Sequence, residues 1–167
     1  HTRLQGDWSS DVCSSDLRKD HQIVRALMHD GRLSNQDLAA AVNLSPSPCL
    51  RRVRLLEERG VITGYAALVD QKAMGYPITV FVGIRLSKHD QATVQAFERA
   101  IGAIDDILDC FLMTGDIDYL LRVVAPDLDG YERFVRERLH AIDGIASIDT
   151  SLAYGVVKQS RVLPLPG

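Results

Sequence analysis

Hydrophobic positions in the first part of the chain recur every three or four residues, as they do along one face of a helix. The first such segment, residues 17–28, predicts a helix that Asp16 can cap and that ends at Gly31. A second, shorter helix is predicted over residues 38–42, where Ser34 supplies an acceptor cap. Two short helices joined by a few polar residues are therefore expected.

The next segment carries helix signals at both ends. Ser47 is a natural N-cap, and Pro48 fits the first helical position, where a missing N–H has no partner to lose. Gly60 can take the left-handed conformation that follows the end of a helix. We predict a third helix between Pro48 and Gly60.

This third helix has an apolar side and a cationic side. The residues concerned are Cys49, Val53 and Leu56 on the first and Arg51, Arg52 and Arg59 on the second. Helix N-termini, hydroxyl groups and arginines bind DNA phosphates, and arginine also pairs with guanine. Taken alone, the helix fits equally well as an amphipathic surface helix with a solvated charged face.

The neighbouring helices favour DNA binding. Only a few residues around Asn43 and Leu44 separate the second helix from the cationic third. Three helices in this arrangement are typical of a helix-turn-helix. Residues 61–69 are β-prone and predict a strand or small ribbon beside the helices, and residues 70–77, with Gly75 and Pro77, predict a hinge between two domains.

The second half alternates strands and helices. Strands are predicted over residues 78–86, 107–113, 119–124 and 145–158, and helices over residues 90–101 and 127–140. Asp90 and Asp127 can cap the two helices, and residues 115–118 form a turn between the middle strands. The order β-α-β-β-α-β predicts a ferredoxin-like domain, so the whole chain is an α+β protein.

The predicted sheet is apolar on both faces. Val80, Val82, Ile84, Leu121, Val123 and Leu152 share one face, and Phe81, Leu120 and Val124 share the other. Because the helices of this fold cover only one face, the second face needs another cover. A second subunit is the simplest cover, which predicts a homodimer.

Composition agrees with a soluble globular protein of ordinary size. The chain has 167 residues, of which 46% are hydrophobic and 25% charged, and no apolar run reaches the length of a membrane span. Its net charge is −3, but residues 18–60 hold 8 Lys and Arg against 5 Asp and Glu, whereas residues 77–167 hold 9 against 13. The positive half suits DNA, and the negative half does not.

Cysteine usage and the first residues add two expectations. The 3 cysteines and 5 histidines are scattered, which favours a reducing, cytoplasmic location and argues against a metal or cofactor site. Residues 1–16 are polar and serine-rich without periodicity, and they lack the pattern of a secretory signal. We expect them to be a disordered or non-native extension.

Four stretches of the chain resemble the Lrp/AsnC (feast/famine) family of transcriptional regulators, with the leucine-responsive branch fitting best. They are DGRLS at 30–34, LSPSPCLRRV at 44–53, GVITGY at 60–65 and MTGDIDY at 113–119. The resemblance runs from about residue 17 to about residue 159. It implies a winged helix-turn-helix, a hinge, a ligand-sensing domain over residues 78–167, dimers that often assemble into octamers, and an amino-acid effector bound between dimers. Leu55 departs from the family pattern, which often has a charged residue there; it can pack either on the ribbon or on a DNA sugar.

Two sets of site residues follow. For double-stranded DNA we expect Ser45, Ser47, Pro48, Arg51 and Arg52, with Arg32, Ser34 and Arg54 at phosphates; local capping is an equally good role for the serines. For a free amino acid, the resemblance implies the turn Thr114, Gly115, Asp116, Ile117, Asp118 and Tyr119, with His140 from a neighbouring subunit. A glycine turn offers backbone N–H groups to a carboxylate, and an aspartate can bind an ammonium group.

No catalytic motif is present, so we predict no enzymatic activity. The predicted function is sequence-specific regulation of transcription, with DNA affinity or assembly altered by the effector. Two alternatives remain open at this point. One is an architectural DNA-wrapping protein without an effector, and the other is an amino-acid-sensing module of a metabolic system.

Overall fold

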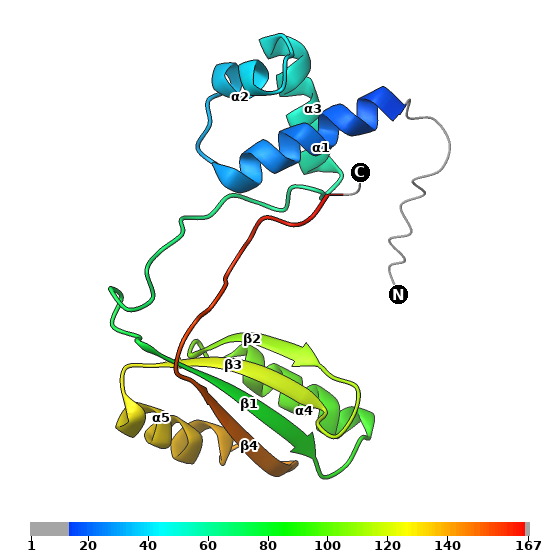
Figure 1. Ribbon diagram of the computed structural model, residues 1–167. Helices are drawn as coiled ribbons and strands as arrows, with labels where there is room; N and C mark the ends of the chain where they lie inside the picture. Colours follow the sequence, from blue (N-terminus) through cyan, green and yellow to red (C-terminus); the bar gives the residue numbers. More distant parts are fainter. Residues whose placement is uncertain (1–13, 166–167) are drawn as a thin grey trace. The chain divides into compact units, whose positions relative to one another are not determined.

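The computed structural model describes residues 14–165, which form two compact units (Figure 1). Unit 1 contains the three N-terminal helices and the end of the chain from Lys158, and unit 2 runs from Leu68 to Val157. The prediction of a disordered extension over residues 1–16 falls mostly outside the described residues. It was wrong for residues 14–16, which already belong to the first helix.

Three helices make up most of unit 1. They are α1 Ser14–His29, α2 Asn35–Ala41 and α3 Pro46–Glu58. Their inward side chains form one core, in which Ile23, Leu38 and Cys49 are at most 3% exposed. As predicted, Ser34 caps α2 by accepting a hydrogen bond from the backbone N–H of Asp37.

The start of α3 differs from our prediction. The helix begins at Pro46 with Ser45 as N-cap, two residues before the predicted Ser47–Pro48 start. The sequence repeats Ser-Pro, and both prolines fit a first turn whose N–H groups need no intrahelical partner. The side chain of Ser45 makes no capping hydrogen bond, so the backbone carbonyl of Ser45, which accepts from Cys49 N–H, starts the helix.

The predicted strand over residues 61–69 is also absent, and this segment forms no regular element. Gly64 has φ 158°, and Tyr65, Leu68 and Val69 are exposed. A strand exists only by pairing, and the described residues offer this segment no neighbouring strand.

Unit 2 is a four-stranded antiparallel sheet with helices on one face. Its elements are β1 Ile78–Leu86, α4 Gln91–Gly102, β2 Ile107–Leu112, β3 Tyr119–Ala125, α5 Leu128–Phe134 with the π-helical segment η1 Val135–Leu139, and β4 Ile145–Ala153. The strand order is β2-β3-β1-β4, as the β-α-β-β-α-β prediction requires. Asp90 and Asp127 cap α4 and α5 as predicted.

The last strand is shorter than predicted. It ends at Ala153 rather than at residue 158, because its partner β1 begins at Ile78 and the final pair is Thr79 with Ala153. Beyond that pair, Tyr154 is fully exposed.

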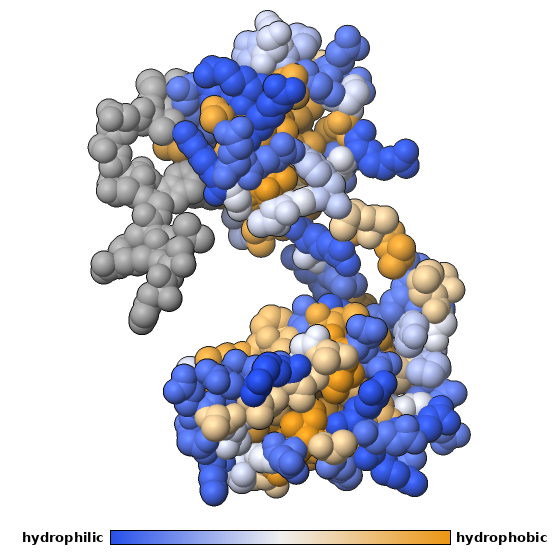
Figure 2. All heavy atoms as spheres, turned by 180° about the vertical axis from the view of Figure 1, so that it is seen from behind, coloured by the Kyte–Doolittle hydropathy of each residue, from blue (hydrophilic) through white to orange (hydrophobic). Residues whose placement is uncertain are grey.

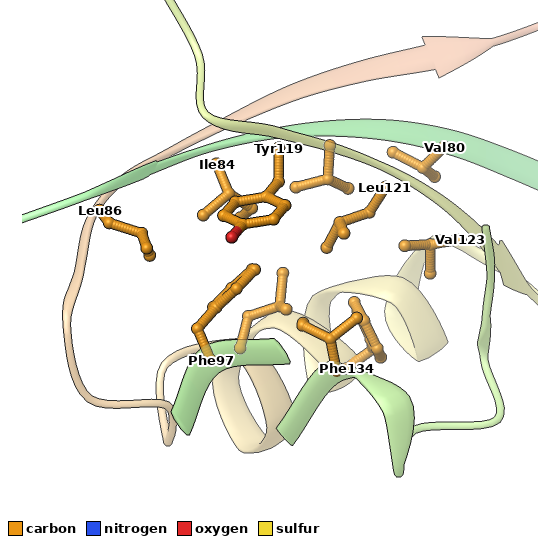
Figure 3. Close-up of a cluster of buried hydrophobic side chains, with 11 residues drawn as sticks. Val80, Ile84, Leu86, Phe97, Tyr119, Leu121, Val123 and Phe134 are labelled. Atoms are coloured by element: carbon orange, nitrogen blue, oxygen red, sulfur yellow. The ribbon is translucent and has the colours of Figure 1, made fainter. Parts of the chain in front are cut away.

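The core of unit 2 lies between the sheet and the helices (Figure 3). Val80, Leu121 and Val123 point from the strands toward Phe97 of α4 and Phe134 of α5. The predicted inner face of the sheet is therefore confirmed, except that Leu152 on the edge strand is 51% exposed. On the side of the molecule shown in Figure 2, hydrophilic residues cover most of the helical unit, whereas apolar residues gather across the middle of the sheet unit with hydrophilic residues around them.

Among residues 14–165, no helix covers the other face of the sheet (Figure 1). Phe81 and Leu120 pair with Ser151 and Phe111 across neighbouring strands, and Phe111 is 51% exposed. No helix among residues 14–165 is long and apolar enough to cross a membrane.

Candidate nucleic-acid interface and ligand site

The connection between α2 and α3 is short and held by hydrogen bonds. Asn43 takes a left-handed conformation, φ 53°, and Leu44 N–H donates to the carbonyl of Ala39. The side chain of Asn35, at the start of α2, donates to the carbonyl of Pro46 at the start of α3 over 2.9 Å. Both ends of α2 are thus held, one by the turn and the other by the start of α3, which fixes the pair as a helix-turn-helix.

One side of α3 belongs to the core, as predicted. Cys49 and Leu56 are buried, and Val53 packs against them. Burial raises the pKa of the Cys49 thiol, so this cysteine stays neutral and acts as a small hydrophobic residue. The opposite side of α3 is therefore the one that faces outward.

The outward side of α3 forms a shallow, mixed surface. Its lining residues are Ser47, Leu50, Arg51, Arg54, Leu55 and Glu58. Arg51 and Arg54 are exposed, whereas Leu55 is half-buried. Ser47, Arg51 and Arg54 were predicted as DNA contacts, and the structure brings them together around an apolar floor.

Arg52 lies elsewhere. Its guanidinium turns toward α1, donates to the Asp20 carboxylate over 2.9 Å and also pairs with the Asp16 carboxylate. Only 17% of its side chain is exposed. The prediction grouped Arg52 with Arg51 because they are adjacent, but a step of 100° on a helix separates a half-buried position from an exposed one.

The remaining predicted contacts lie around the same helices. Ser45 and Pro48 are exposed in the first turn of α3, and the side chain of Arg32 is exposed before α2. The Ser34 hydroxyl accepts from Asp37 N–H and donates to the Asp37 carboxylate. Its local capping role is therefore present in this structure.

The second predicted site is the turn between β2 and β3. Gly115 has φ 110°, a conformation that favours glycine, and Thr114, Gly115 and Asp116 are exposed. Met113 N–H donates to the carbonyl of Asp118, which closes the turn.

The turn is tied to the end of β1 by charged side chains. Arg85 donates through Nε to the carbonyl of Asp116 over 2.9 Å. Asp118 accepts from Leu86 N–H over 2.7 Å and lies 2.9 Å from Nε2 of His89. These hydrogen bonds lower the pKa of Asp118, the backbone bond from Leu86 having the larger effect. Sequence reasoning missed Arg85 and His89, because only the pairing of β1 with β3 brings them to the turn.

Two residues of the predicted turn, Ile117 and Tyr119, pack within unit 2. The methyl groups of Ile117 lie over Gly83, where an added Cβ would stand 3.1 Å from Cγ2 of Ile117. Tyr119 is a core residue, 4% exposed, with its ring 4.7 Å from that of Phe97. Its hydroxyl donates to Glu98, and burial together with this bond raises its pKa to about 12.

His140 is exposed beside a depression at the end of η1. The depression is lined by Leu139, His140, Ile142, Ile145, Ala146, Ser147 and Ile148. Among the described residues, the ring of His140 makes no hydrogen bond with the turn at Gly115. Residues 14–165 also contain no cluster of His, Cys, Asp or Glu arranged to hold a metal ion.

Two family models match the chain along most of its length. Residues 16–63 match a winged helix-turn-helix DNA-binding domain, and residues 79–163 match the Lrp/AsnC ligand binding domain. The matches correspond to the helical unit and to the sheet unit. They identify the first as the DNA-binding part and the second as the ligand-binding part.

Curated relatives and solved structures agree. The chain is 43% identical over 148 residues to the Bkd operon transcriptional regulator of Pseudomonas aeruginosa, covering 89% of this chain and 97% of the relative. It is 38% identical over 146 residues to the leucine-responsive regulatory protein of Escherichia coli, covering 87% and 89%. A transcriptional regulator of Neisseria meningitidis in complex with L-Met has a TM-score of 0.85 at 31% identity, covering 88% of this chain and 95% of that one.

These findings establish the predicted class of protein, a DNA-binding regulator with a small-molecule domain rather than an enzyme. The Escherichia coli and Neisseria meningitidis relatives are named for a response to leucine and for a complex with methionine, respectively. The chain belongs to the Lrp/AsnC family of transcriptional regulators.

Proposed function

We propose that this regulator reads DNA with the outward face of α3 and responds to a free aliphatic amino acid bound at the turn of Gly115. The observation that carries the DNA part is the separation of the two sides of α3. Cys49 and Leu56 are buried, while Ser47, Arg51 and Arg54 share an exposed surface. An exposed arginine pair with a hydroxyl suits phosphates and guanine edges in a major groove.

The other predicted DNA contacts have supporting positions. Ser45 and Pro48 lie on either side of the start of α3; because Pro46 and Pro48 have no backbone N–H, the N–H of Ser47 is the donor that this turn offers to a phosphate. Arg32 precedes α2 and is exposed, so it can meet a neighbouring phosphate, and Ser34 sits at the α2 N-terminus. Arg52 is not among the proposed contacts, because its guanidinium is paired with Asp16 and Asp20.

The effector proposal rests on which groups of the turn are free. A zwitterion needs donors for its carboxylate and an acceptor for its ammonium group. Asp118 already binds Leu86 N–H and His89, and Tyr119 is buried. The side chain of Asp116 has no hydrogen-bond partner among the described residues, so we assign it the ammonium group and assign the exposed backbone around Gly115 the carboxylate.

The same reasoning leaves Ile117 as an apolar contact for the effector and His140 as a contribution from a neighbouring subunit. Relatives named for leucine and methionine support an aliphatic side chain. The helix-free face of the sheet, with Phe81, Phe111 and Leu120, supports assembly into a homodimer, and dimers can associate further into an octamer. Binding between dimers then changes the spacing of the DNA-binding units.

A thermal-shift screen against the twenty amino acids tests the effector. A ligand that binds only the folded state raises the melting temperature, so leucine, methionine or a similar side chain is expected to give a concentration-dependent shift. Asp116→Asn is expected to remove the shift. Light scattering of the unaltered protein is expected to show a change in assembly size when the stabilising amino acid is added. No shift from any amino acid at saturating concentration would contradict the effector proposal and favour an architectural DNA-binding protein.

The DNA surface is tested by Arg51→Ala on a duplex selected by the unaltered protein from a random-sequence library. Loss of one phosphate contact lowers the salt dependence of log K by about 0.9 per log unit of salt, and loss of a guanine contact costs about 1–3 kcal/mol. Unchanged affinity and salt dependence would remove α3 from the proposed interface.

A further inference from the structure

Helix α1 carries three charged residues on one face that contact both helices of the helix-turn-helix. Asp16, Lys19 and Asp20 are spaced three and four residues apart and so lie together on α1. Lys19 donates to the carbonyl of Val42 at the end of α2 over 2.6 Å. Asp16 and Asp20 both pair with Arg52 of α3.

Both terminal nitrogens of the Arg52 guanidinium are hydrogen-bonded to α1. Nη1 donates to the Asp20 carboxylate over 2.9 Å and to the backbone carbonyl of Asp16 over 3.4 Å, and Nη2 donates to the Asp16 carboxylate. The side chains of Arg52 and Asp20 are 17% and 18% exposed. A phosphate that approached this guanidinium would also approach the carboxylates of Asp16 and Asp20, which repel it.

Hydrophobic packing alone leaves the rotation of α3 loosely determined. Cys49, Val53 and Leu56 make non-directional contacts, which a small rotation of the helix preserves in large part. A guanidinium held by two carboxylates is directional, because its planar donors accept only a narrow range of geometry. Since Arg51 is the residue immediately before Arg52, the rotation that Arg52 fixes also sets where Arg51 points.

We propose that Arg52 is a positioning residue, held by Asp16 and Asp20, which fixes the rotation of α3 on α1 so that the outward face of α3 matches its DNA sequence. The inference rests on the proposed reading of DNA by α3. It replaces the direct DNA contact that the sequence predicted for Arg52, and it gives α1 a part in specificity without any contact with DNA.

The test uses fluorescence anisotropy with two duplexes, one selected from a random-sequence library by the unaltered protein and one scrambled duplex of the same composition. The variants are Asp16→Asn with Asp20→Asn, Arg52→Lys and Arg52→Ala, and Arg51→Ala serves as control. Each is measured over a range of KCl concentrations and below its melting temperature, determined by circular dichroism. Asp16→Asn alone is the milder variant if the double change unfolds unit 1.

A positioning role predicts that the Asn variants and Arg52→Lys lose preference for the selected duplex by about tenfold or more, a change of about 1.4 kcal/mol. The slope of log K against log salt is expected to stay as in the unaltered protein. Arg52→Lys is diagnostic because lysine keeps the charge for a phosphate but cannot bridge two carboxylates in the same geometry.

Two results would overturn the inference while leaving the proposed DNA surface in place. If Arg52 contacts DNA directly, Arg52→Ala lowers the salt slope by about 0.9 and Arg52→Lys retains both affinity and preference. If the ion pairs only stabilise the fold, the melting temperature falls while the preference for the selected duplex stays unchanged. A control Arg51→Ala without effect would instead contradict the proposed DNA surface itself, and the inference with it.

Discussion

The carboxylate of Asp118 accepts a hydrogen bond of 2.7 Å from the backbone N–H of Leu86, which ends the neighbouring strand β1. This bond, together with the 2.9 Å contact to His89, makes Asp118 an anchor of the turn rather than a free ligand for an ammonium group. The effector turn is therefore held in place from behind, and its exposed residues remain available.

Acid is expected to loosen this turn. Because the folded-state pKa of Asp118 lies below its ordinary value of 3.8, the carboxylate adds stability above that value and loses it as pH falls through the folded pKa. The free energy of unfolding of unit 2, measured by urea denaturation between pH 5 and pH 2, should fall more steeply with decreasing pH in the unaltered protein than in Asp118→Asn. Asp116→Asn is the matched control and should retain the steep loss; equal pH dependence in all three proteins would contradict the anchoring role.

Alkali is expected to act through Tyr119. Its folded-state pKa is about 12 against an ordinary 10.0, so the bonded, neutral phenol adds stability below pH 10 that is lost as pH rises toward 12. An absorbance titration should show one tyrosine that ionises only near pH 12, and Tyr119→Phe should remove it. If Tyr119→Phe leaves the late-ionising phenol in place, the assignment is wrong.

Gly83 and Ile117 are expected to be coupled. A Cβ at position 83 would lie 3.1 Å from Cγ2 of Ile117, closer than ordinary contact, so Gly83→Ala should displace Ile117 and weaken effector binding. Ile117→Ala removes that methyl group, so the double variant should lose less affinity than the two single effects combined. Binding is measured by isothermal titration calorimetry. If the losses of binding free energy of the two single variants simply add in the double variant, the contact between Gly83 and Ile117 does not shape the site.

Two glycines of unit 2 should respond to alanine in opposite directions. Gly144, between η1 and β4, has φ 91°, and its added Cβ would lie 2.8 Å from Cγ2 of Thr93. Gly144→Ala should therefore destabilise the unit by about 1–3 kcal/mol. Gly102 ends α4 with nothing near its Cβ position, so Gly102→Ala should be neutral or stabilise by up to about 1 kcal/mol. Thermal denaturation of the two variants checks both expectations. A Gly144→Ala variant as stable as the unaltered protein would contradict the positive φ and the close approach to Thr93 at this position.

Local signals in the sequence were sufficient for most of unit 2. The run of β-branched residues placed β1 at its observed bounds, and Asp90 and Asp127 marked helix starts because a carboxylate can cap free N–H groups. The start of α3 was misplaced because the two Ser-Pro pairs give the same local signal, and packing of the three helices selects between them.

The site residues depended more on tertiary contacts. Arg51 and Arg52 look alike in sequence, and only the approach of α1 separates an exposed arginine from one paired with Asp16 and Asp20. Likewise, the turn at Gly115 was recognised by its motif, but the register of β3 on β1 decides that Asp118 is anchored and Tyr119 buried. Arg85 and His89 carry no local signal of a role at that turn.

The most direct test of the account is the affinity of the protein for its selected duplex, measured by fluorescence anisotropy with and without the amino acid that gives the largest thermal shift. We predict that the amino acid changes the affinity at least severalfold in the unaltered protein, while Asp116→Asn binds DNA normally and does not respond. If the amino acid binds but DNA affinity and assembly size stay the same in both proteins, the claim that this site controls DNA binding is contradicted.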